Sequence, residues 1–452
     1  MSEHDVIVIG MGVGGEEVAG RLAESGLDVL AVERKLVGGE CPYWGCIPSK
    51  IMVRAGGSLA EAARIMGLAG DAQISPEWAP VARRVRVATA DWNDEIAVER
   101  HEKRGETFIR GNARLVGPRT VEVDGRTFSA RRGVVLATGT EPAVPPIEGL
   151  DSIDFWTNRD AIEAKDAPAS IVIVGAGPIG LELGQVFKRF GSDVAFIELF
   201  DHALAYDEPE IGVAVAHVLS DEGIELHTGV SAQRVRAKNG GVEIELSDGR
   251  QLAAERILVA TGRKANLTGL GLEAVGLDPD ARALEVDARM RSGDGLWAVG
   301  DITGKGQFTH VAVYQGRIAA ADILGKEHAA ADYRAVPRVT FMDPEVAVVG
   351  LTAQKAHEEG VNVRVGLTET KTSARGWIHG PGAEHGVIKL VADADRNFLV
   401  GASVMSPGAG EIIGFLGLAI SERVPIGRLR DLIYPYPTFV RGVEDALRDL
   451  DS

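Results

Sequence analysis

The stretch DVIVIGMGVGG, residues 5–15, joins a short β-branched run to a glycine-rich loop. The run predicts a buried parallel strand. Residues 16–25 follow at helical spacing, and a second apolar run over residues 28–32 leads into an acid. In this order the glycines let backbone amides approach a pyrophosphate at the helix N-terminus, and the acid accepts hydrogen bonds from ribose hydroxyls. The stretch therefore predicts a dinucleotide site rather than a plain tight turn, formed by Gly10, Gly12, Gly15 and Glu33.

The same unit recurs later in the chain. A predicted strand over residues 169–174 leads to a second glycine-rich loop, a helix over residues 181–190 and a strand over residues 193–197. The first glycine and the acid stand equally far apart in both copies, and each copy leads to a later strand that ends in Ala-Thr-Gly. Two such units predict two dinucleotide folds in one chain. The motif residues of the second copy are Gly175, Gly177, Gly180 and Glu198.

The only two cysteines of the chain, Cys41 and Cys46, are separated by four residues. A disulfide that closes so small a loop would stabilise the fold little. An alternative interpretation is a pair of buried small hydrophobic side chains. Pro48 stands where a first helical turn would begin, so Cys46 falls near a helix N-terminus, where the dipole lowers a thiol pKa. We favour a redox-active pair that receives electrons from the two nucleotide cofactors.

The chain has 452 residues and a formal net charge of −17. The length predicts roughly two to four domains. The acidic charge argues against a nucleic acid, which needs a basic surface, and against an anionic membrane. No apolar run reaches the length of a membrane span, and residues 1–5 lack the basic region of a signal peptide. We therefore expect a cytoplasmic protein, a setting in which this cysteine pair is more often catalytic than structural.

The segment between the two nucleotide units is predicted to be mixed. Residues 51–104 are helix-like and polar on one side. Strands are expected over residues 107–114 and 121–128, with Asp124-Gly125 as a hairpin turn. The proline-rich residues 141–146 form a natural linker into the second unit.

Two further features follow the second unit. Residues 295–301 predict a strand that ends in Gly300-Asp301, and this places a carboxylate at the sheet edge where open α/β folds bind ligands. The alternative role for Asp301 is a helix cap. From residue 335 the pattern changes to alternating strands and one helix, which predicts a separate α+β domain. The expected strands are residues 346–349, 387–391 and 398–402, and the expected helix is residues 410–421.

This ordered set of motifs resembles the pyridine nucleotide–disulfide oxidoreductases, a family that includes dihydrolipoamide dehydrogenase, glutathione reductase and mercuric reductase. The resemblance covers nearly the whole chain. It implies an α/β fold with two Rossmann-like dinucleotide-binding domains, for FAD and for NAD, and a C-terminal α+β dimerisation domain. The segments that carry it are residues 10–15, 41–50, 138–139, 175–180, 262–263, 300–301 and 341–350. The implied division is 1–145 for the first part of the FAD-binding domain, 146–265 for the NAD(P)H-binding domain, 266–334 for the second, central part of the FAD-binding domain and 335–452 for the dimerisation domain.

The resemblance also implies roles for single residues. FAD would pass electrons from NAD(P)H to Cys46, the sulfur nearer the flavin, and Cys41 would be the interchange thiol that faces the substrate. Lys50, one helical turn after Cys46, would lie near the flavin with Glu182 as its ion-pair partner. No metal site is implied. The remaining cofactor residues are Gly39, Thr138, Gly139, Gly262, Gly300, Asp301, which would take a ribityl hydroxyl, and Thr309, whose backbone would lie beside the flavin pyrimidine.

The C-terminal motif departs from the resembled family. Its disulfide reductases carry a histidine and a glutamate where this chain has Tyr436 and Arg441. Acid–base catalysis of this kind contributes roughly 10²–10⁴-fold. A tyrosine, with an unperturbed pKa of about 10, is a poor base at neutral pH but can donate a proton. A catalytic role for Tyr436 and simple interface packing both remain open.

Three residues beside the thiols also differ from the family pattern. Glu40 stands where threonine is usual, and this change is expected to alter the contact with the FAD phosphate. Tyr43 and Trp44 stand where an asparagine and a variable residue are common. The two rings could form a stacking platform for a planar substrate or could fill the core. In the resembled family, mercuric reductase captures the metal with a C-terminal cysteine pair. This chain has no such pair, which disfavours mercury as the substrate.

The leading hypothesis is an FAD-dependent enzyme that oxidises NADH and passes electrons by way of Cys41 and Cys46 to a non-standard acceptor, such as a quinone or a small electrophile. Glu198 would repel a 2′-phosphate, so NADPH is the less favoured nucleotide. The alternatives are a dithiol–disulfide enzyme like dihydrolipoamide dehydrogenase and a redox-sensing flavoprotein. The expected partners are a second copy of the chain, in a homodimer, and the small-molecule electron acceptor, with no nucleic acid and no membrane.

Overall fold

The computed structural model describes residues 2–451, which form two compact units. Unit 1 contains residues 2–48, 86–143 and 263–333. Unit 2 contains residues 49–85, 144–262 and 334–451. Both nucleotide-binding folds predicted from the sequence are present, the first in unit 1 and the second in unit 2.

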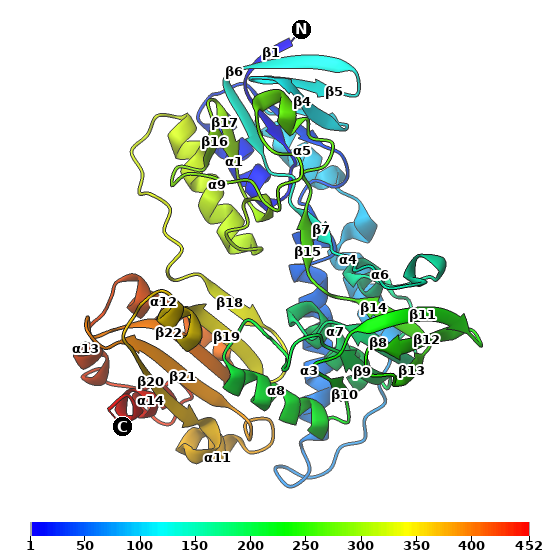
Figure 1. The fold of residues 1–452 in the computed structure, drawn as a ribbon, viewed down its shortest axis with the longest axis vertical. Coiled ribbons are helices and arrows are strands. Elements are labelled where there is room, and N and C mark those ends of the chain that lie inside the picture. The colour runs from blue at the N-terminus through cyan, green and yellow to red at the C-terminus, as the bar shows by residue number, and fades with distance from the viewer. Residues whose placement is uncertain (1, 452) are drawn as a thin grey trace. The chain divides into compact units, whose positions relative to one another are not determined.

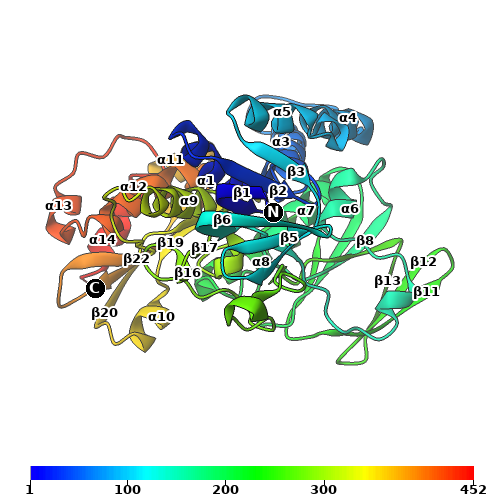
Figure 2. The same cartoon turned by 90° about the horizontal axis from the view of Figure 1, so that it is seen from above.

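Unit 1 is built on an eight-stranded sheet. Six strands follow the order β16-β17-β6-β1-β2-β3, of which β17, β6, β1, β2 and β3 are parallel, and β5 and β4 continue from β6 in antiparallel fashion. Figure 2 shows β6, β1, β2 and β3 side by side in this order. The bounds are β1 Ser2–Ile9, β2 Val29–Glu33, β3 Thr107–Arg110, β4 Ala113–Gly117, β5 Thr120–Val123, β6 Arg126–Leu136, β16 Arg291–Gly293 and β17 Leu296–Ala298.

The predicted first strand packs into two cores. Val6 and Val8 enter one hydrophobic cluster with helices α1 and α9, and Ile7 and Ile9 enter a second cluster on the other face of the sheet. This alternation is the two-residue period of a strand with both faces buried. Helices α1 and α9 lie side by side (Figure 1). The helices that unit 1 holds whole are α1 Val13–Glu24, α2 Glu40–Tyr43, α5 Glu95–Lys103 and α9 Thr309–Ile323, and a two-stranded ribbon joins β7 Thr140–Pro142 to β15 Arg263–Ala265.

Two strand predictions in unit 1 are wrong. The expected strand over residues 121–128 is divided at Asp124-Gly125 into β5 and β6. The expected strand over residues 107–114 is divided into β3 and β4. Gly111 lies between them against the Asp124 side chain, so closely that a Cβ there would stand 2.4 Å from Asp124 Oδ2. The chain therefore turns at Gly111 instead of continuing. The expected hairpin at Asp124-Gly125 is confirmed, since both residues have positive φ between β5 and β6.

The second nucleotide-binding fold is a four-stranded parallel sheet in the order β10-β9-β8-β14. Residues 49–85, which belong to the predicted FAD-binding segment 1–145, lie in the same compact unit as this sheet. The Trp78 side chain explains this grouping, because its ring stacks on Phe187 and its Nε1 donates to the carbonyl of Ala164. The bounds are β8 Ser170–Val174, β9 Asp193–Ile197, β10 Glu225–His227, β14 Arg256–Val259, α3 Cys46–Ala63, α4 Trp78–Ala88, α6 Asn158–Glu163, α7 Pro178–Arg189 and α8 Pro209–Asp221, with α3 starting in unit 1 and α4 ending in it.

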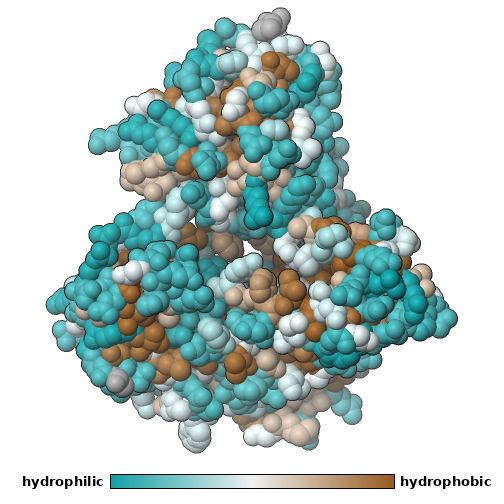
Figure 3. All heavy atoms as spheres, in the orientation of Figure 1, coloured by the Kyte–Doolittle hydropathy of each residue, from teal (hydrophilic) through white to brown (hydrophobic). Residues whose placement is uncertain are grey.

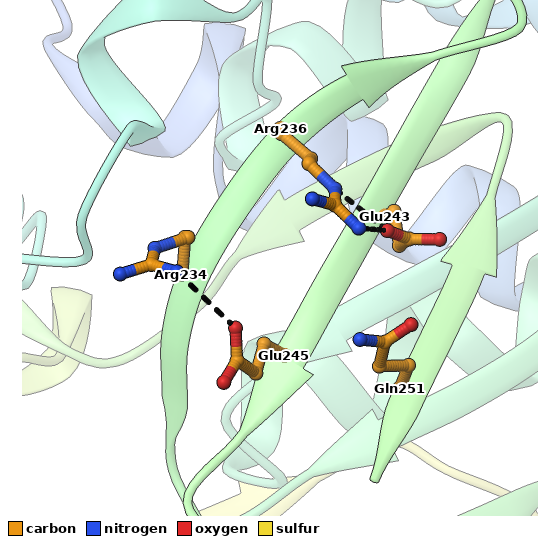
Figure 4. Close-up of a pocket in the computed structure, with 5 residues that line it drawn as sticks. All are labelled: Arg234, Arg236, Glu243, Glu245 and Gln251. Atoms are coloured by element: carbon orange, nitrogen blue, oxygen red, sulfur yellow. Dashed lines mark hydrogen bonds and ion pairs between the residues drawn. The ribbon is translucent and has the colours of Figure 1, made fainter. Parts of the chain in front are cut away.

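A small antiparallel sheet in unit 2 was not predicted from the sequence. It contains β11 (Ala232–Lys238), β12 (Gly241–Leu246) and β13 (Gln251–Ala254). Figure 4 shows its charged face. Residues opposite each other on β11 and β12 form ion pairs there: Arg234 with Glu245 at 3.6 Å, and Arg236 with Glu243. The hollow that these side chains line contains none of the predicted site residues. We interpret this face as a solvated surface, where ion pairs contribute little to stability.

The C-terminal part of unit 2 is a five-stranded antiparallel sheet in the order β18-β19-β22-β21-β20. The expected helix over residues 410–421 is confirmed as α12, and it shares a hydrophobic core with the sheet. Four more α-helices occur that the sequence did not predict, because each has eight residues or fewer, less than the window over which helical periodicity is read. The bounds are β18 Pro337–Thr340, β19 Glu345–Gly350, β20 Val363–Glu369, β21 Val387–Asp393, β22 Phe398–Ser406, α10 Ala353–Glu358, α11 Ala374–His379, α12 Ala409–Ser421, α13 Ile426–Arg430 and α14 Gly442–Asp449.

This C-terminal part also exposes apolar surface. Figure 3 shows hydrophobic atoms over the region where Figure 1 draws β20, β22 and α14. Several large apolar side chains of the C-terminal part are exposed: Trp377, Ile378, Leu418, Leu432 and Ile433. Exposed apolar surface of this kind is typical of an interface.

A buried lysine on β21 joins the sheet to helix α8. Lys389 Nζ lies 2.8 Å from Glu208 Oε2 and 2.7 Å from Glu210 Oε2, and the Lys389 and Glu208 side chains are 7% and 2% exposed. Removing one member of a buried pair leaves an uncompensated charge, which costs roughly 3–5 kcal/mol. We therefore expect Lys389→Met to lower the free energy of unfolding by about 3 kcal/mol, measured by urea denaturation.

The matched control is Lys355→Met on α10. Lys355 is exposed and pairs with Glu358 at 3.4 Å, so its replacement should change the free energy of unfolding by no more than about 0.5 kcal/mol. Equal effects of the two substitutions would contradict the assigned role of Lys389.

Candidate active site

The two glycine-rich loops have the same local geometry. Helix α1 has Gly12 at its N-cap and helix α7 has Gly177, and no side chain caps either helix. A Cβ at Gly15 would lie 2.0 Å from the carbonyl oxygen of Gly10, and a Cβ at Gly180 would lie 2.2 Å from that of Gly175. Glycine at the third motif position therefore lets each helix approach its loop closely and present its N-terminal amides.

The acid at the end of each second strand is held in the same way in both copies. Glu33 accepts hydrogen bonds from the amides of Met11, at 2.8 Å, and Lys35, at 2.7 Å. Glu198 accepts from the amides of Ala176, at 2.7 Å, and Phe200, at 3.0 Å. Each carboxylate oxygen has a second lone pair that can accept from a ribose hydroxyl. The internal repeat read from the sequence is therefore a structural repeat as well.

The two cysteines lie at the junction of helices α2 and α3. Helix α3 begins at Cys46, which confirms the expected helix start. The Cys46 Sγ lies 3.3 Å from the hydroxyl of Thr309, the first residue of α9. The neighbouring Cys46 thiol and burial both raise the pKa of Cys41. This arrangement favours a negative charge on Cys46 and a proton on Cys41.

The expected exposure of the two thiols is wrong. The sequence predicts Cys41 as the exposed thiol, but Cys41 is half-buried and Cys46 is exposed. Cys41 lies inside the short helix α2, whose next turn packs tightly, since a Cβ at Gly45 would lie 3.1 Å from the carbonyl oxygen of Glu40. Cys46 instead stands at the first position of α3.

Lys50 lies one turn after Cys46 on α3 and forms an ion pair with Glu182. Its Nζ is 2.5 Å from Glu182 Oε2 and 4.7 Å from the ring centroid of Phe341. Glu182 is buried, and its second oxygen accepts from the amide of Phe341 at 2.9 Å. The pairing expected for Lys50 and Glu182 is thus present, with Phe341 as a third member that contacts both.

Asp301 lies at the carboxyl end of β17, in a short network of polar groups. Its Oδ2 accepts from the Thr140 hydroxyl at 2.7 Å. Arg263 donates through Nε to the same hydroxyl at 2.7 Å, and its Nη2 lies 3.3 Å from Glu40 Oε2. Burial raises the pKa of Asp301, Thr140 and Arg263 oppose this change, and the charge of Glu40 adds to it.

The backbone around these groups is held by two amide side chains. Gln315, completely buried on α9, accepts from the amide of Gly300 at 2.7 Å and donates to Thr303. Asn266 donates through its side-chain amide to the carbonyl of Thr138 at 2.9 Å, and its backbone carbonyl accepts from the Thr138 hydroxyl at 2.9 Å. Gly39 stands at the N-cap of α2, where a Cβ would lie 2.9 Å from the Cα of Gly12.

The aromatic residues beside the thiols differ from each other. Tyr43 is 6% exposed, so its ring fills the core, and Trp44 is half-buried with its ring centroid 5.9 Å from that of Tyr43. Tyr436 is 69% exposed, and the guanidinium of Arg441 lies 5.4 Å from its ring centroid. Arg441 also pairs with Glu444 at 3.3 Å.

A buried histidine fixes the first turn of α1. His101 Nδ1 lies 2.8 Å from Glu106, and its Nε2 lies 2.9 Å from Glu16, the acid in that first turn. Burial lowers the pKa of His101, but the hydrogen bonds that its ring donates to Glu106 and Glu16 outweigh it and raise the pKa to about 9.

The raised pKa predicts how stability depends on pH. A folded-state pKa above the unfolded value means that the His101 contribution is fully present below about pH 6.5 and is lost as pH rises through about 9. We expect the melting temperature to fall between pH 7 and pH 10 by more in the wild type than in His101→Gln. Parallel pH profiles of the two proteins would contradict this role.

Comparison with known proteins decides the family. A family model described as pyridine nucleotide-disulphide oxidoreductase matches residues 4–316, and the dimerisation domain of the same family matches residues 336–447. The chain belongs to this family. Family members bind FAD and NAD(P)H, and the protein is an FAD-dependent oxidoreductase of this kind.

Relatives and solved structures of the family align with nearly the whole chain. Mercuric reductase from Staphylococcus aureus is 33% identical over 457 residues, which cover 100% of this chain and 83% of that protein. Dihydrolipoyl dehydrogenase from Thermus scotoductus is 35% identical over 466 residues, covering 100% and 98%. LpdA from Mycobacterium tuberculosis superposes with a TM-score of 0.86 at 26% identity, covering 100% of both chains. HOCl-induced flavoprotein disulfide reductase RclA from Escherichia coli gives 0.84 at 25% identity, covering 98% of this chain and 99% of that one.

The residues of this family member fit both cofactors. Helices α1 and α7 offer N-terminal amides that no side chain caps. A Cβ at Gly139, Gly177 or Gly262 would meet no atom within 4 Å, so the backbone there is open to a ligand. Carboxylates stand at Glu33 and Glu198 for the ribose hydroxyls.

In the described range 2–451, no helix is long and apolar enough to cross a membrane, and no group of three or more His, Cys, Asp or Glu side chains is arranged to hold a metal ion.

Three residues of the candidate site were not singled out from the sequence. They are Phe341 beside Lys50, Arg263 beside Asp301, and Gln315 behind Gly300. Arg263 and Phe341 lie inside segments that carry the family resemblance. Gln315 could have been found as a polar residue on a helix face whose other buried side chains, apart from Asp322, are small or apolar.

Proposed function

We propose that the protein oxidises NADH and passes the electrons through FAD and the Cys41–Cys46 pair to a small-molecule acceptor, and that a quinone is a better acceptor than a disulfide. The observation that carries the proposal is Tyr436, an exposed tyrosine with Arg441 over its ring. Neither side chain suits proton exchange with a thiol near pH 7. A quinone draws its protons from water and does not depend on such a pair.

The proposed roles of the chain's residues follow from their positions. FAD, when bound, supplies hydride acceptance from NADH and two-electron transfer to sulfur. The amides at the start of α1 and α7 bind the two pyrophosphates, and Glu33 and Glu198 orient the riboses. Cys46 holds the negative charge of the reduced pair at Sγ, and Cys41 holds the proton. Lys50, kept in place by Glu182 and Phe341, supplies a fixed positive charge.

Further parts of the proposal concern organisation. We infer a homodimer that forms through the dimerisation domain, whose apolar side chains are exposed. We retain the division into residues 1–145, 146–265, 266–334 and 335–452, and a cytoplasmic location, as proposals. The cofactor contacts of Gly39, Thr138, Gly300, Asp301 and Thr309 also stay predictions.

The nucleotide preference rests on Glu198. His202 and Lys188 are the cations on either side of Glu198 in the sequence that could contact a 2′-phosphate, and each has another contact in the structure. His202 packs against Gly212 with Nδ1 at the carbonyl of Ala203, and Lys188 lies 3.9 Å from Asp193. The proposal is therefore that the protein prefers NADH.

Replacing Glu198 tests this preference. We expect the wild type to have a kcat/KM for NADH at least roughly tenfold above that for NADPH, and Glu198→Arg to shift the ratio toward NADPH by roughly 10²-fold, because the change replaces a repelled charge with an attracted one. Glu198→Gln, which removes the charge alone, should give an intermediate ratio. Equal kcat/KM values for the two nucleotides in the wild type would refute the prediction.

A second candidate function is dithiol–disulfide oxidoreduction. The full-length alignment with a dihydrolipoyl dehydrogenase favours it. In that case Tyr436 or water would serve in place of the missing pair.

Anaerobic titration with NADH tests the step common to both candidates. One equivalent of NADH should convert the oxidised Cys41–Cys46 pair into two thiols, counted by alkylation and mass spectrometry. No new thiols after addition of NADH would refute the proposal that the cysteines receive the electrons.

A further inference from the structure

The acid before the first thiol is paired with an arginine. Glu40 begins helix α2 and directly precedes Cys41. Its Oε2 lies 3.3 Å from Arg263 Nη2, and the two side chains are 27% and 12% exposed. The family resemblance places a threonine at position 40, so this ion pair is a property of this chain. A partly buried pair is screened by salt less than an exposed one.

The same arginine serves a second carboxylate. Arg263 donates to the hydroxyl of Thr140 at 2.7 Å and to its carbonyl at 3.0 Å, and that hydroxyl donates to Asp301 at 2.7 Å. Arg263 therefore lies between two acids, Glu40 on the thiol side and Asp301 on the other. Removing either member of the Glu40–Arg263 pair changes the net charge beside the thiols by one unit, with opposite sign.

We propose that the Glu40–Arg263 ion pair sets the equilibrium between the disulfide and dithiol forms of Cys41 and Cys46, an inference that rests on the proposed function of the two cysteines. Reduction breaks the S–S bond and takes up two electrons and one proton. The proton goes to Cys41, and Cys46 carries the negative charge. The reduced form thus has one more negative charge than the disulfide. A charge added or removed nearby changes the stability of the reduced form more than that of the oxidised form.

Residue 40 is the chain neighbour of Cys41. The Cα atoms of consecutive residues are about 3.8 Å apart, and the Debye length is about 10 Å at 0.1 M salt. In Glu40→Gln the charge of Arg263 is no longer offset, so the reduced form is stabilised. In Arg263→Gln the charge of Glu40 is no longer offset, so the reduced form is destabilised. Each change should shift the equilibrium constant by roughly tenfold, which corresponds to about 30 mV.

The opposite signs separate an electrostatic role from a merely structural one. Both substitutions break the same ion pair, so a pair that only held the turn in place would shift the equilibrium in one direction for both.

The test uses FAD-loaded enzyme equilibrated with mixtures of reduced and oxidised dithiothreitol. Reduced dithiothreitol supplies the two electrons and becomes the cyclic disulfide. The fraction of free thiol at Cys41 and Cys46 is then trapped by alkylation and measured by mass spectrometry.

Two further variants complete the experiment. Glu40→Thr removes the charge with the residue usual in the family and should shift the equilibrium in the same direction as Glu40→Gln. Glu141→Gln is the matched control, because Glu141 is exposed on the strand paired with that of Arg263 and loses the same charge. We expect it to leave the equilibrium within about twofold of the wild type.

The outcomes distinguish this inference from the proposed function. Opposite shifts of roughly tenfold for Glu40→Gln and Arg263→Gln support it. Shifts in the same direction, or no shift in Glu40→Gln and Glu40→Thr, overturn it and leave the redox pair intact. A wild-type enzyme that exchanges no thiols with dithiothreitol overturns the proposed function, and this inference with it.

Discussion

Replacing Cys46 with serine is expected to abolish the long-wavelength absorption band of the two-electron-reduced enzyme and to lower NADH-driven reduction of a disulfide substrate by at least about 10³-fold. The reason is the position of Cys46. It is the first residue of α3. The hydroxyl of Thr309, the first residue of α9, lies 3.3 Å from its sulfur. Both helix ends and the hydroxyl favour the thiolate on this cysteine.

Cys41→Ser is the matched comparison. Burial and the neighbouring thiol raise the pKa of Cys41, so it is expected to hold a proton in the reduced pair. The band should therefore persist or grow in Cys41→Ser, although disulfide reduction should be lost there too. The measurement is the anaerobic absorption spectrum after addition of two electrons to each variant. A band that survives in Cys46→Ser and disappears in Cys41→Ser would exchange the two roles.

Restoring the family's acid–base pair should raise disulfide reduction. We expect Tyr436→His combined with Arg441→Glu to increase kcat/KM for lipoamide by roughly 10²-fold, within the range that general acid–base catalysis contributes. Reduction of a quinone should change by less than about threefold, since it draws protons from water. The measurement compares kcat/KM for the two acceptors in the wild type and the double variant.

The local contacts at this site define the controls. Arg441 pairs with Glu444 at 3.3 Å and lies over the Tyr436 ring, so a glutamate at 441 faces a like charge three residues away. The single variants Tyr436→His and Arg441→Glu, together with the melting temperature, separate this cost from any gain in chemistry. Equal changes for lipoamide and quinone in the double variant would show that residues 436 and 441 do not decide the choice of acceptor.

The parts of the fold that the sequence predicted are those with a strong local pattern. Residues 5–15 combine a β-branched run with a glycine loop, and the structure has β1 and the uncapped start of α1 there. The second copy at residues 169–198 behaves in the same way. The helix start at Cys46 was predictable for a similar reason, because Pro48 suits a first helical turn and leaves little choice of boundary.

The parts that the sequence did not predict depend on contacts between distant segments. The bend at Gly111 arises from the Asp124 side chain, and the burial of Cys41 arises from the packing of the turn around Gly45. The Glu40–Arg263 pair joins residues more than two hundred positions apart. The periodicity of a segment does not show which distant residues contact it. The charged sheet of β11, β12 and β13 in Figure 4 is a different case, because β12 alternates Val242, Ile244 and Leu246 with charged residues, a strand pattern that could have been found from the sequence.

Steady-state oxidation of NADH with a quinone and with lipoamide tests the central claim most directly. The two acceptors should be compared by kcat/KM in the wild-type protein at pH 7, with glutathione disulfide as a second disulfide. Because Tyr436 and Arg441 replace the acid–base pair, we predict that kcat/KM for the quinone exceeds that for either disulfide by at least roughly tenfold. Efficient lipoamide turnover by the wild type, with tyrosine at position 436, would contradict the claim and establish the dithiol–disulfide function in its place.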